Sequence, residues 1–169
     1  MKLDIACGAN RQKGFKGVDI IPGDGVDFVY DLEKYPWTPF GESSCDEIYI
    51  GHYAEYTKDL MKFMDEVWRV AENGAKVSIV ASHFKSVRAY QDPTAVRALT
   101  EATWAYFNKE WRMQNGAGHY PVTANFSVER VMLFFNPPWD RKSDEARQFA
   151  QEHYWNVVSG MLVELKAIK

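Results

Sequence analysis

Acidic side chains end two short apolar segments near the start of the chain, where they could accept hydrogen bonds from a nucleoside. Asp19 closes residues 17–19 and Asp31 closes residues 28–31, while residues 3–8 pass from an apolar strand directly into the tight sequence Ala-Cys-Gly. A close backbone turn and carboxylates at the carboxyl ends of parallel strands are typical of an edge that binds nucleosides. The first thirty residues therefore predict a nucleoside site.

The stretch between Gly8 and Gly17 limits which nucleoside could bind. It is too short for a full crossover helix, because a complete strand–helix–strand connection usually needs at least ~10–12 residues. Without that helix, no helix N-terminus is available to hold a phosphate. A nicotinamide dinucleotide would also need Gly-x-Gly-x-x-Gly at the start of a helix, which the sequence ACGANR does not provide. The pattern therefore argues against a pyrophosphate ligand.

Two histidines and a glutamate follow later strands and could act as acids or bases. His52 and Glu55 come directly after the predicted strand 47–50, and His83 follows the predicted strand 76–81. Because an imidazole titrates near neutral pH, His52 is the first candidate for a general base, the alternative being that it only lines the pocket. Glu55 either takes part or orients the following segment. His83 either faces the same crevice or is a loop histidine satisfied within the protein.

Strands and helices that alternate along the chain must position these residues. The helix expected at 59–71 has apolar residues at helical spacing, Asp59 as N-cap and Asn73-Gly74 as its end. This order predicts an α/β fold, a Rossmann-like open, twisted and mostly parallel sheet with an antiparallel C-terminal edge strand. Further elements are expected as a short helix after Thr100, a strand at 128–135, a helix at 143–158 ended by Gly160, and a strand at 161–168.

Length and composition restrict the class of protein. A length of 169 residues predicts one domain over 1–169. The net charge of −3 gives no excess of basic residues for sequence-independent binding of nucleic acid. Cys7 and Cys45 lack the spacing of a metal site or a disulfide framework, so no metal is expected. With no signal peptide and no apolar run long enough for a bilayer, a cytoplasmic location without membrane contact is expected.

The sequence resembles the class I S-adenosylmethionine-dependent methyltransferases, and among them the compact subgroup that lacks a full first crossover helix. The similar segments are LDIACGANRQKGFKGVDI, DLEKYPW, CDEIYIGHYAEY, LMKFMDEVWRVAENGAKVSIVASHF and DPTAVRALT, within residues 2–107. The chain departs from the family pattern where Ala6 and Asn10 replace turn glycines. It also departs where Ala95 replaces a histidine, so that no acid–base role is expected at this position.

The resemblance implies a set of cofactor contacts. Asp4 would order water or the ammonium group, Asp19 would accept hydrogen bonds from the ribose hydroxyls, and Asp31 would face the adenine. The cofactor would be S-adenosylmethionine, with S-adenosylhomocysteine as product. The residues implied are Asp4, Ala6, Cys7, Gly8, Ala9, Asp19, Ile20, Asp31, Leu32, His52 and Tyr53.

Substrate contacts are expected in the second half of the chain. Tyr90 and Arg97 fall in the segment that should fold over the acceptor, where Arg97 either binds an anionic group or forms a surface salt bridge. The only material for a cap is residues 82–127 and 139–158, which suits a small molecule or a sugar better than a polymer. The aromatic second half could also form a face between subunits, so a homodimer is an expectation.

The sequence thus predicts an enzyme that methylates a small-molecule or sugar acceptor at oxygen or nitrogen. One alternative is methylation of a nucleic-acid amino group, because the sequence Asn136-Pro137-Pro138-Trp139 has the form that such enzymes place at a strand end. The near-neutral charge and the position of this segment on a late strand count against that reading. Another alternative is a protein that binds the cofactor, or a lyase that consumes it, without transferring a methyl group.

Overall fold

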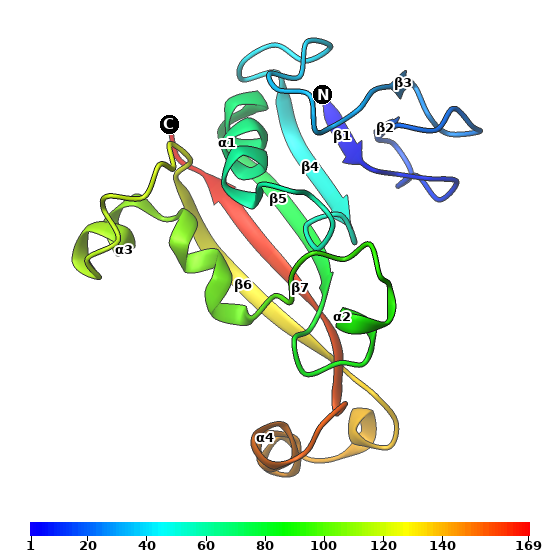
Figure 1. Cartoon of the computed structure of the whole chain (residues 1–169), viewed down its shortest axis with the longest axis vertical. Coiled ribbons are helices and arrows are strands. Elements are labelled where there is room, and N and C mark those ends of the chain that lie inside the picture. Colours follow the sequence, from blue (N-terminus) through cyan, green and yellow to red (C-terminus); the bar gives the residue numbers. More distant parts are fainter.

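The computed structural model describes all 169 residues, and its centre is one seven-stranded sheet (Figure 1). The strand order is β3-β2-β1-β4-β5-β7-β6, in which β7 runs antiparallel to both of its neighbours and the other pairs are parallel. This confirms the predicted open, mostly parallel sheet with an antiparallel edge. Within the antiparallel part, the C-terminal strand takes the inner place and β6 the outermost. The strands are β1 Lys2–Ile5, β2 Lys16–Asp19, β3 Phe28–Val29, β4 Cys45–Gly51, β5 Ala71–Ser82, β6 Phe126–Phe135 and β7 Val158–Ala167.

The first three strands connect without helices, as expected from the short spacing. The chain leaves β1, forms a turn and returns as β2 beside it, and then β4 pairs with the opposite side of β1. Strand order therefore reverses between β1 and β4. In open α/β sheets, ligands bind outside the carboxyl ends of the strands at such a reversal. The residues after β1 and after β4 are accordingly the first place to look for a site.

Helix α1 (Leu60–Val70) agrees with the predicted 59–71, with Asp59 and Ala71 as its caps. The Asp59 side chain caps it by accepting a hydrogen bond from the Lys62 backbone N–H at 3.1 Å. Asn73-Gly74 does not form its end: Ala71 is already the C-cap and pairs with Cys45 as the first residue of β5, so that Asn73 and Gly74 lie within this strand. The other helical segments are α2 Arg88–Gln91, η1 Glu101–Phe107, α3 Lys109–Gln114, η2 Trp139–Arg141 and α4 Asp144–His153.

Helix α4 is shorter than the expected 143–158. It ends when the Tyr154 N–H bonds to the Ala150 carbonyl, after which Asn156 takes a φ of 59° and redirects the chain. Gly160 lies inside β7, opposite Ser82, and does not end the helix. Figure 1 shows the β6–β7 hairpin running past the ends of β4 and β5, with α4 at its far end.

The core forms on one face of the sheet by simple strand alternation. Ile48 and Ile50 are fully buried against α1, whereas Tyr49 between them is only partly buried. On the other face, ion pairs such as Lys2 with Glu47 (2.6 Å) cross between neighbouring strands. One face therefore stabilises the fold by apolar burial, and the carboxyl ends of the strands are left to carry function.

Candidate cofactor and acceptor site

The turn after β1 has the backbone conformation that close approach of a ligand requires. Ala6 and Gly8 have φ values of 54° and 51°, in the left-handed region. The Gly8 N–H donates to Asp19 Oδ2 at 2.9 Å, and the Ile21 N–H donates to Asp19 Oδ1 at 3.0 Å. The Asp19 carboxylate therefore supports the turn across two strand ends. Each of its oxygens has further lone-pair capacity to accept a ligand hydroxyl.

Two side chains lie beneath this turn. Asp4 is 2% exposed, and its Oδ2 accepts a hydrogen bond from the Gln12 N–H at 2.6 Å. Burial raises the pKa of Asp4, and the hydrogen bond from Gln12 only partly opposes this. Burial also raises the pKa of Cys7, which keeps its sulfur a thiol and fits a packing role. Ala9 is exposed at the surface of the turn.

Asp27 organises the same region, and sequence reasoning did not identify it. Its carboxylate accepts hydrogen bonds from the Gly17 N–H (2.9 Å), from Lys16 Nζ (2.8 Å) and from Arg11 Nη1 (2.6 Å). The bond from Lys16, followed by that from the Gly17 N–H, holds the pKa of Asp27 well below its usual range. Nothing in the local pattern marks Asp27, because its partners come from other segments.

Gly17 has no room for a side chain. A Cβ there would lie 2.3 Å from the Gly25 carbonyl oxygen and 2.6 Å from Cys7 Sγ. We expect Gly17→Ala to lower the free energy of unfolding by about 1–3 kcal/mol, because the backbone must shift. Thermal unfolding checks this, with Gly23→Ala as control, since nothing lies within 4 Å of a Cβ at Gly23. Equal melting temperatures for the two variants would contradict the packing argument.

The residues after β2 and β3 extend the edge. Ile20 is 61% exposed directly after Asp19. Asp31 Oδ1 accepts from the Glu33 N–H at 3.1 Å. Leu32 is buried in the core, and its carbonyl accepts from the Trp37 indole N–H at 2.9 Å.

Glu33, which the sequence did not single out, links this segment to the residues after β4. It accepts hydrogen bonds from the Tyr53 hydroxyl at 3.1 Å and from the Lys58 N–H at 3.3 Å. Burial and the nearby Glu33 charge raise the pKa of Tyr53, so its phenol stays protonated. Tyr53 is thus held as a hydrogen-bond donor at this edge.

His52 and Glu55 form a pair at the end of β4. His52 has a φ of 53°, uncommon for a non-glycine residue, and its side chain is about half exposed. Glu55 is 3% exposed, and its Oε1 contacts His52 Nδ1 at 3.2 Å and accepts from the Ser82 N–H at 2.7 Å. Glu55 Oε2 is buried without a partner.

The environment of Glu55 defines the protonation of this pair. Burial acts to raise the pKa of Glu55, but the hydrogen bonds from His52 and from the Ser82 N–H outweigh it, and the net pKa is lowered. An ionised Glu55 assigns the His52 proton to Nδ1 and leaves a lone pair on Nε2. The half-exposed imidazole can then accept a proton at Nε2 from a bound molecule.

His83 and Arg97 are used inside the protein. His83 is fully buried, its Nδ1 accepts from the Lys85 N–H at 3.3 Å and its Nε2 contacts Glu101 at 3.1 Å. It is thus a satisfied loop histidine. The Arg97 guanidinium donates to the carbonyls of Ala54, Thr57 and Lys58, so neither a surface salt bridge nor a free anion site forms.

The segment 136–139 lies away from His52. Strands β5 and β7 separate β6 from β4, and three strand spacings of ~4.8 Å make about 14 Å. The Asn136 amide donates to the Asn156 carbonyl at 2.9 Å, closing the neck of the hairpin. Its position and this bond do not suit recognition of a base beside His52.

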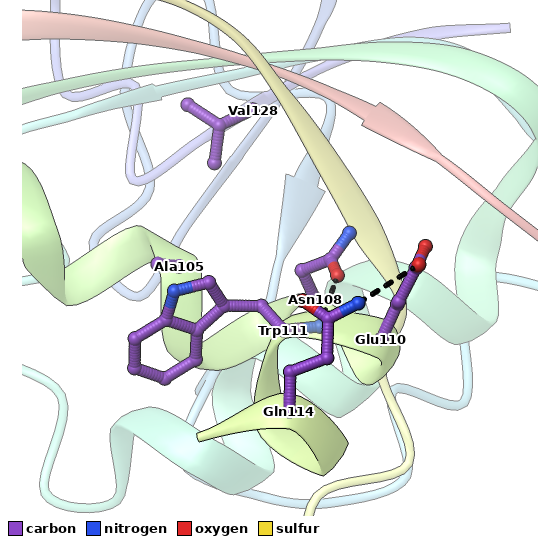
Figure 2. A pocket seen from close by; sticks show the side chains of 6 residues that line it. All are labelled: Ala105, Asn108, Glu110, Trp111, Gln114 and Val128. Atoms are coloured by element: carbon purple, nitrogen blue, oxygen red, sulfur yellow. Dashed lines mark hydrogen bonds between the residues drawn. The ribbon is translucent and has the colours of Figure 1, made fainter.

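A cavity of about 350 Å³ lies between η1, α3 and β6 (Figure 2). Its residue from β6, Val128, lies near the start of that strand, and no residue at the carboxyl ends of β1 or β4 lines it. Its polar groups are used locally: Asn108 Oδ1 accepts from the Trp111 N–H at 2.8 Å, and Gln114 donates to Glu110 at 3.1 Å. These bonds cap and support α3, so this cavity is not part of the site. The lining residues are Ala105, Asn108, Glu110, Trp111, Gln114 and Val128.

Comparisons with known proteins address the fold. No protein-family model and no curated protein matches the sequence, whereas solved structures do match it. A SAM-dependent methyltransferase from Archaeoglobus fulgidus has 16% identity and a TM-score of 0.63, over 98% of this chain and 85% of that one. One from Mesorhizobium loti has 14% identity and a TM-score of 0.58, over 98% and 89%. The cyclase SpnF has 11% identity and a TM-score of 0.58, over 99% and 74%.

None of the helices is long and apolar enough to cross a bilayer. The structural match to the Archaeoglobus fulgidus protein extends over 98% of the chain. At these identities the agreement concerns architecture, since activity resides in the site and not in the fold. The chain has the fold of the class I SAM-dependent methyltransferases.

Proposed function

We propose that this protein binds S-adenosylmethionine at the reversal between β1 and β4 and methylates an oxygen or nitrogen of a small-molecule or sugar acceptor. The observation that carries the proposal is the left-handed turn Ala6–Gly8, supported by the Asp19 carboxylate, in a methyltransferase fold. His52 lies at the neighbouring strand end, β4. The turn that lets the backbone approach the ligand thus follows β1. The proposed ribose acceptor, Asp19, ends the neighbouring strand β2, and the proposed base, His52, follows β4 on the other side of β1.

The residues at this edge fit a sulfonium nucleoside. Asp19 offers a carboxylate at the surface of the turn, while Asp27 binds the nearby cations Arg11 and Lys16. A positively charged ligand without phosphates suits this charge distribution better than a dinucleotide does. The exposed Ile20 would pack on the adenine. The proposed contacts are Asp4, Ala6, Cys7, Gly8, Ala9, Asp19, Ile20, Asp31, Leu32, His52 and Tyr53.

When bound, S-adenosylmethionine supplies an electrophilic methyl group. The chain has to hold an acceptor in line with it, since proximity and alignment provide much of the acceleration in a displacement. His52 Nε2 takes the proton from an acceptor hydroxyl, and Glu55 orients the imidazole through Nδ1. Because Glu55 is buried and ionised, it also stabilises the positive charge that His52 then carries.

Calorimetry with S-adenosylhomocysteine tests the binding proposal. We expect Asp19→Ala to weaken binding by about 10- to 100-fold, because a hydrogen bond to a charged group contributes about 1.5–3 kcal/mol. Asp24→Ala is the matched control, an exposed carboxylate a few residues away. A thermal melt of both variants separates loss of the ribose contact from loss of the turn. Binding of NAD in place of S-adenosylhomocysteine would contradict the proposal.

A binding protein or cyclase that uses the same cofactor site is the second candidate, and it is favoured by the matched structure described as a cyclase. Mass spectrometry of an acceptor mixture incubated with S-adenosylmethionine separates the two. A gain of one methyl group in an acceptor supports transfer. Tight S-adenosylhomocysteine binding with no methylated product across the mixture would favour the second candidate.

A further inference from the structure

A second cavity, of about 240 Å³, lies between α1, η1 and the loop 115–125 that leads to β6. Six of its seven lining residues are hydrophobic or aromatic, among them Met61, Tyr106 and Tyr120, and the seventh is Thr103. No charged side chain lines this cavity. None of the residues proposed to bind the cofactor lines it either, so it is separate from the edge formed by the strand ends.

The hydroxyl of Thr103 is already used by the fold. Its oxygen accepts from the Thr100 N–H at 3.1 Å and shares a hydrogen bond with the Thr100 hydroxyl at 3.2 Å, which caps η1. Moving a charged group out of water costs free energy unless a partner replaces its hydration. Because no lining side chain is charged, the cavity favours an uncharged, apolar ligand over an ion.

The loop 115–125 forms one wall of the cavity, and charged side chains outside the lining hold it in place. The Arg112 guanidinium is 4% exposed and donates to the Tyr106 carbonyl at 2.8 Å and to the Val122 carbonyl at 3.1 Å. From α1, Asp65 Oδ1 accepts from the Ala124 N–H at 2.7 Å. These bonds join η1, the loop and α1, so the walls are formed before a ligand binds. A pre-formed, mostly apolar pocket is typical of a small-molecule site.

Aromatic side chains continue from the cavity to the surface. Tyr106 is 40% exposed and Tyr120 is 39% exposed, with ring centroids 5.9 Å apart and planes inclined at 16°. Tyr106 also packs against Trp111, with centroids 4.7 Å apart. Met61, on the α1 side of the cavity, is 37% exposed. Stacked aromatic rings and a polarisable thioether together form a surface that a flat ring contacts well.

We propose that this cavity binds one uncharged planar ring of a small molecule, stacked against Tyr106 and Tyr120. Its volume of about 240 Å³ lies below the usual range for small-molecule pockets, roughly 300–1,000 Å³, and so suits a single ring. Burial of apolar surface supplies the affinity, and the tyrosine hydroxyls offer a hydrogen bond to a polar substituent. The site is additional to the cofactor edge and does not depend on methyl transfer.

Nuclear magnetic resonance of labelled methionine methyl groups tests the proposal with probes that share one ring: benzyl alcohol, benzoate and benzylamine. We expect benzyl alcohol to shift the Met61 signal, which Met61→Leu identifies, and to leave the signal of Met132 on β6 unchanged. Its dissociation constant should be at least ~10-fold lower than that of either ion, because an ion loses hydration here without gaining a charged partner.

Variants locate the bound ring. Val122→Phe should fill the cavity and weaken benzyl alcohol binding by at least ~10-fold, since close packing leaves no room for both rings. Val128→Phe is the matched control, the same change beside the cavity of Figure 2, and should leave this affinity unchanged. Tyr106→Ala should weaken binding by about 2- to 10-fold through loss of the stacking contact.

Thermal melts show which variants are folded, and Tyr106→Ala decides the question if Val122→Phe is not. An unmoved Met61 signal overturns the proposal. Equal or tighter binding of benzoate or benzylamine overturns it as well, because the lining would then not select an uncharged ring. Native affinity for benzyl alcohol in a folded Val122→Phe or Tyr106→Ala protein would place the ring elsewhere.

Discussion

Replacing His52 by alanine is expected to lower kcat of methyl transfer to a hydroxyl by about 10²- to 10⁴-fold, the usual contribution of a general base. S-Adenosylhomocysteine affinity should change much less, since the half-exposed imidazole is free at Nε2 and would contribute mainly to proton transfer. Rates with a methyl acceptor and calorimetry with the product check both parts. His119→Ala is the matched control, an exposed histidine in a distant loop.

The pH dependence follows from the same pair. Glu55 has a lowered pKa, so its carboxylate stays ionised and keeps its contact with His52 down to a lower pH than an ordinary glutamate would. Glu55→Gln removes this charge, and we expect it to lower kcat of methyl transfer, because the positive charge that His52 carries after it takes the acceptor proton loses its charged partner. The difference in kcat between the two proteins should narrow as pH falls through the lowered pKa of Glu55, where the native side chain becomes neutral as well. An unchanged kcat in this variant would show that Glu55 has only a structural role.

Glu66→Ala is expected to cause the largest loss of stability, about 2–4 kcal/mol, because it removes a buried carboxylate that pairs with the partly exposed Arg69 and accepts from a backbone N–H in the core. Glu66 is 7% exposed and its Oε1 accepts from the Trp37 N–H at 2.5 Å and from Arg69 Nη2 at 2.6 Å. The hydrogen bonds that Arg69 donates to Glu66 also raise the pKa of Arg69. Without Glu66, an N–H in the core loses its acceptor and the cation loses its partner.

Thermal unfolding checks this expectation. For a chain of this length, each 1 kcal/mol corresponds to about 2–4 °C, so the melting temperature should fall by roughly 10 °C. Glu72→Ala, an exposed acid six residues on, is the control and should leave the melting temperature nearly unchanged. An equally small fall in melting temperature in both variants would contradict this expectation, because it would mean that water replaces the Glu66 carboxylate without loss of stability.

Local patterns predicted most of the strands because strand burial depends on short apolar runs that can be read directly. Element ends were less predictable. The α1 end at Val70 depends on Ala71 pairing with Cys45, a partner twenty-six positions earlier in the chain. The end of α4 depends on the turn at Asn156, whose N–H bonds to the Lys85 carbonyl. At α1 this pairing fixes an end close to the predicted one, whereas at α4 contacts with a distant segment ended the helix before its local pattern did.

The candidate site divides in the same way. Strand-end positions placed Asp19 and His52 at one edge, because carboxyl ends of parallel strands meet there. The roles of Arg97 and His83 could not be decided from the sequence. Both lie in the segment expected to cover an acceptor, yet their partners are the carbonyls of residues 54–58 for Arg97, and Glu101 and the Lys85 N–H for His83. A polar side chain near a site serves the ligand only when no internal group satisfies it first.

The sequence by itself determined the parallel sheet, the helix-free link between β1 and β2, and the strand ends that carry carboxylates and a histidine. These follow from spacing along the chain. Only the tertiary structure decided that Glu55 holds His52, that Asp27 and Glu33 organise the edge, and that Tyr90 meets Trp155. Each of these contacts joins side chains whose directions depend on turns and on packing between segments, which no local pattern encodes.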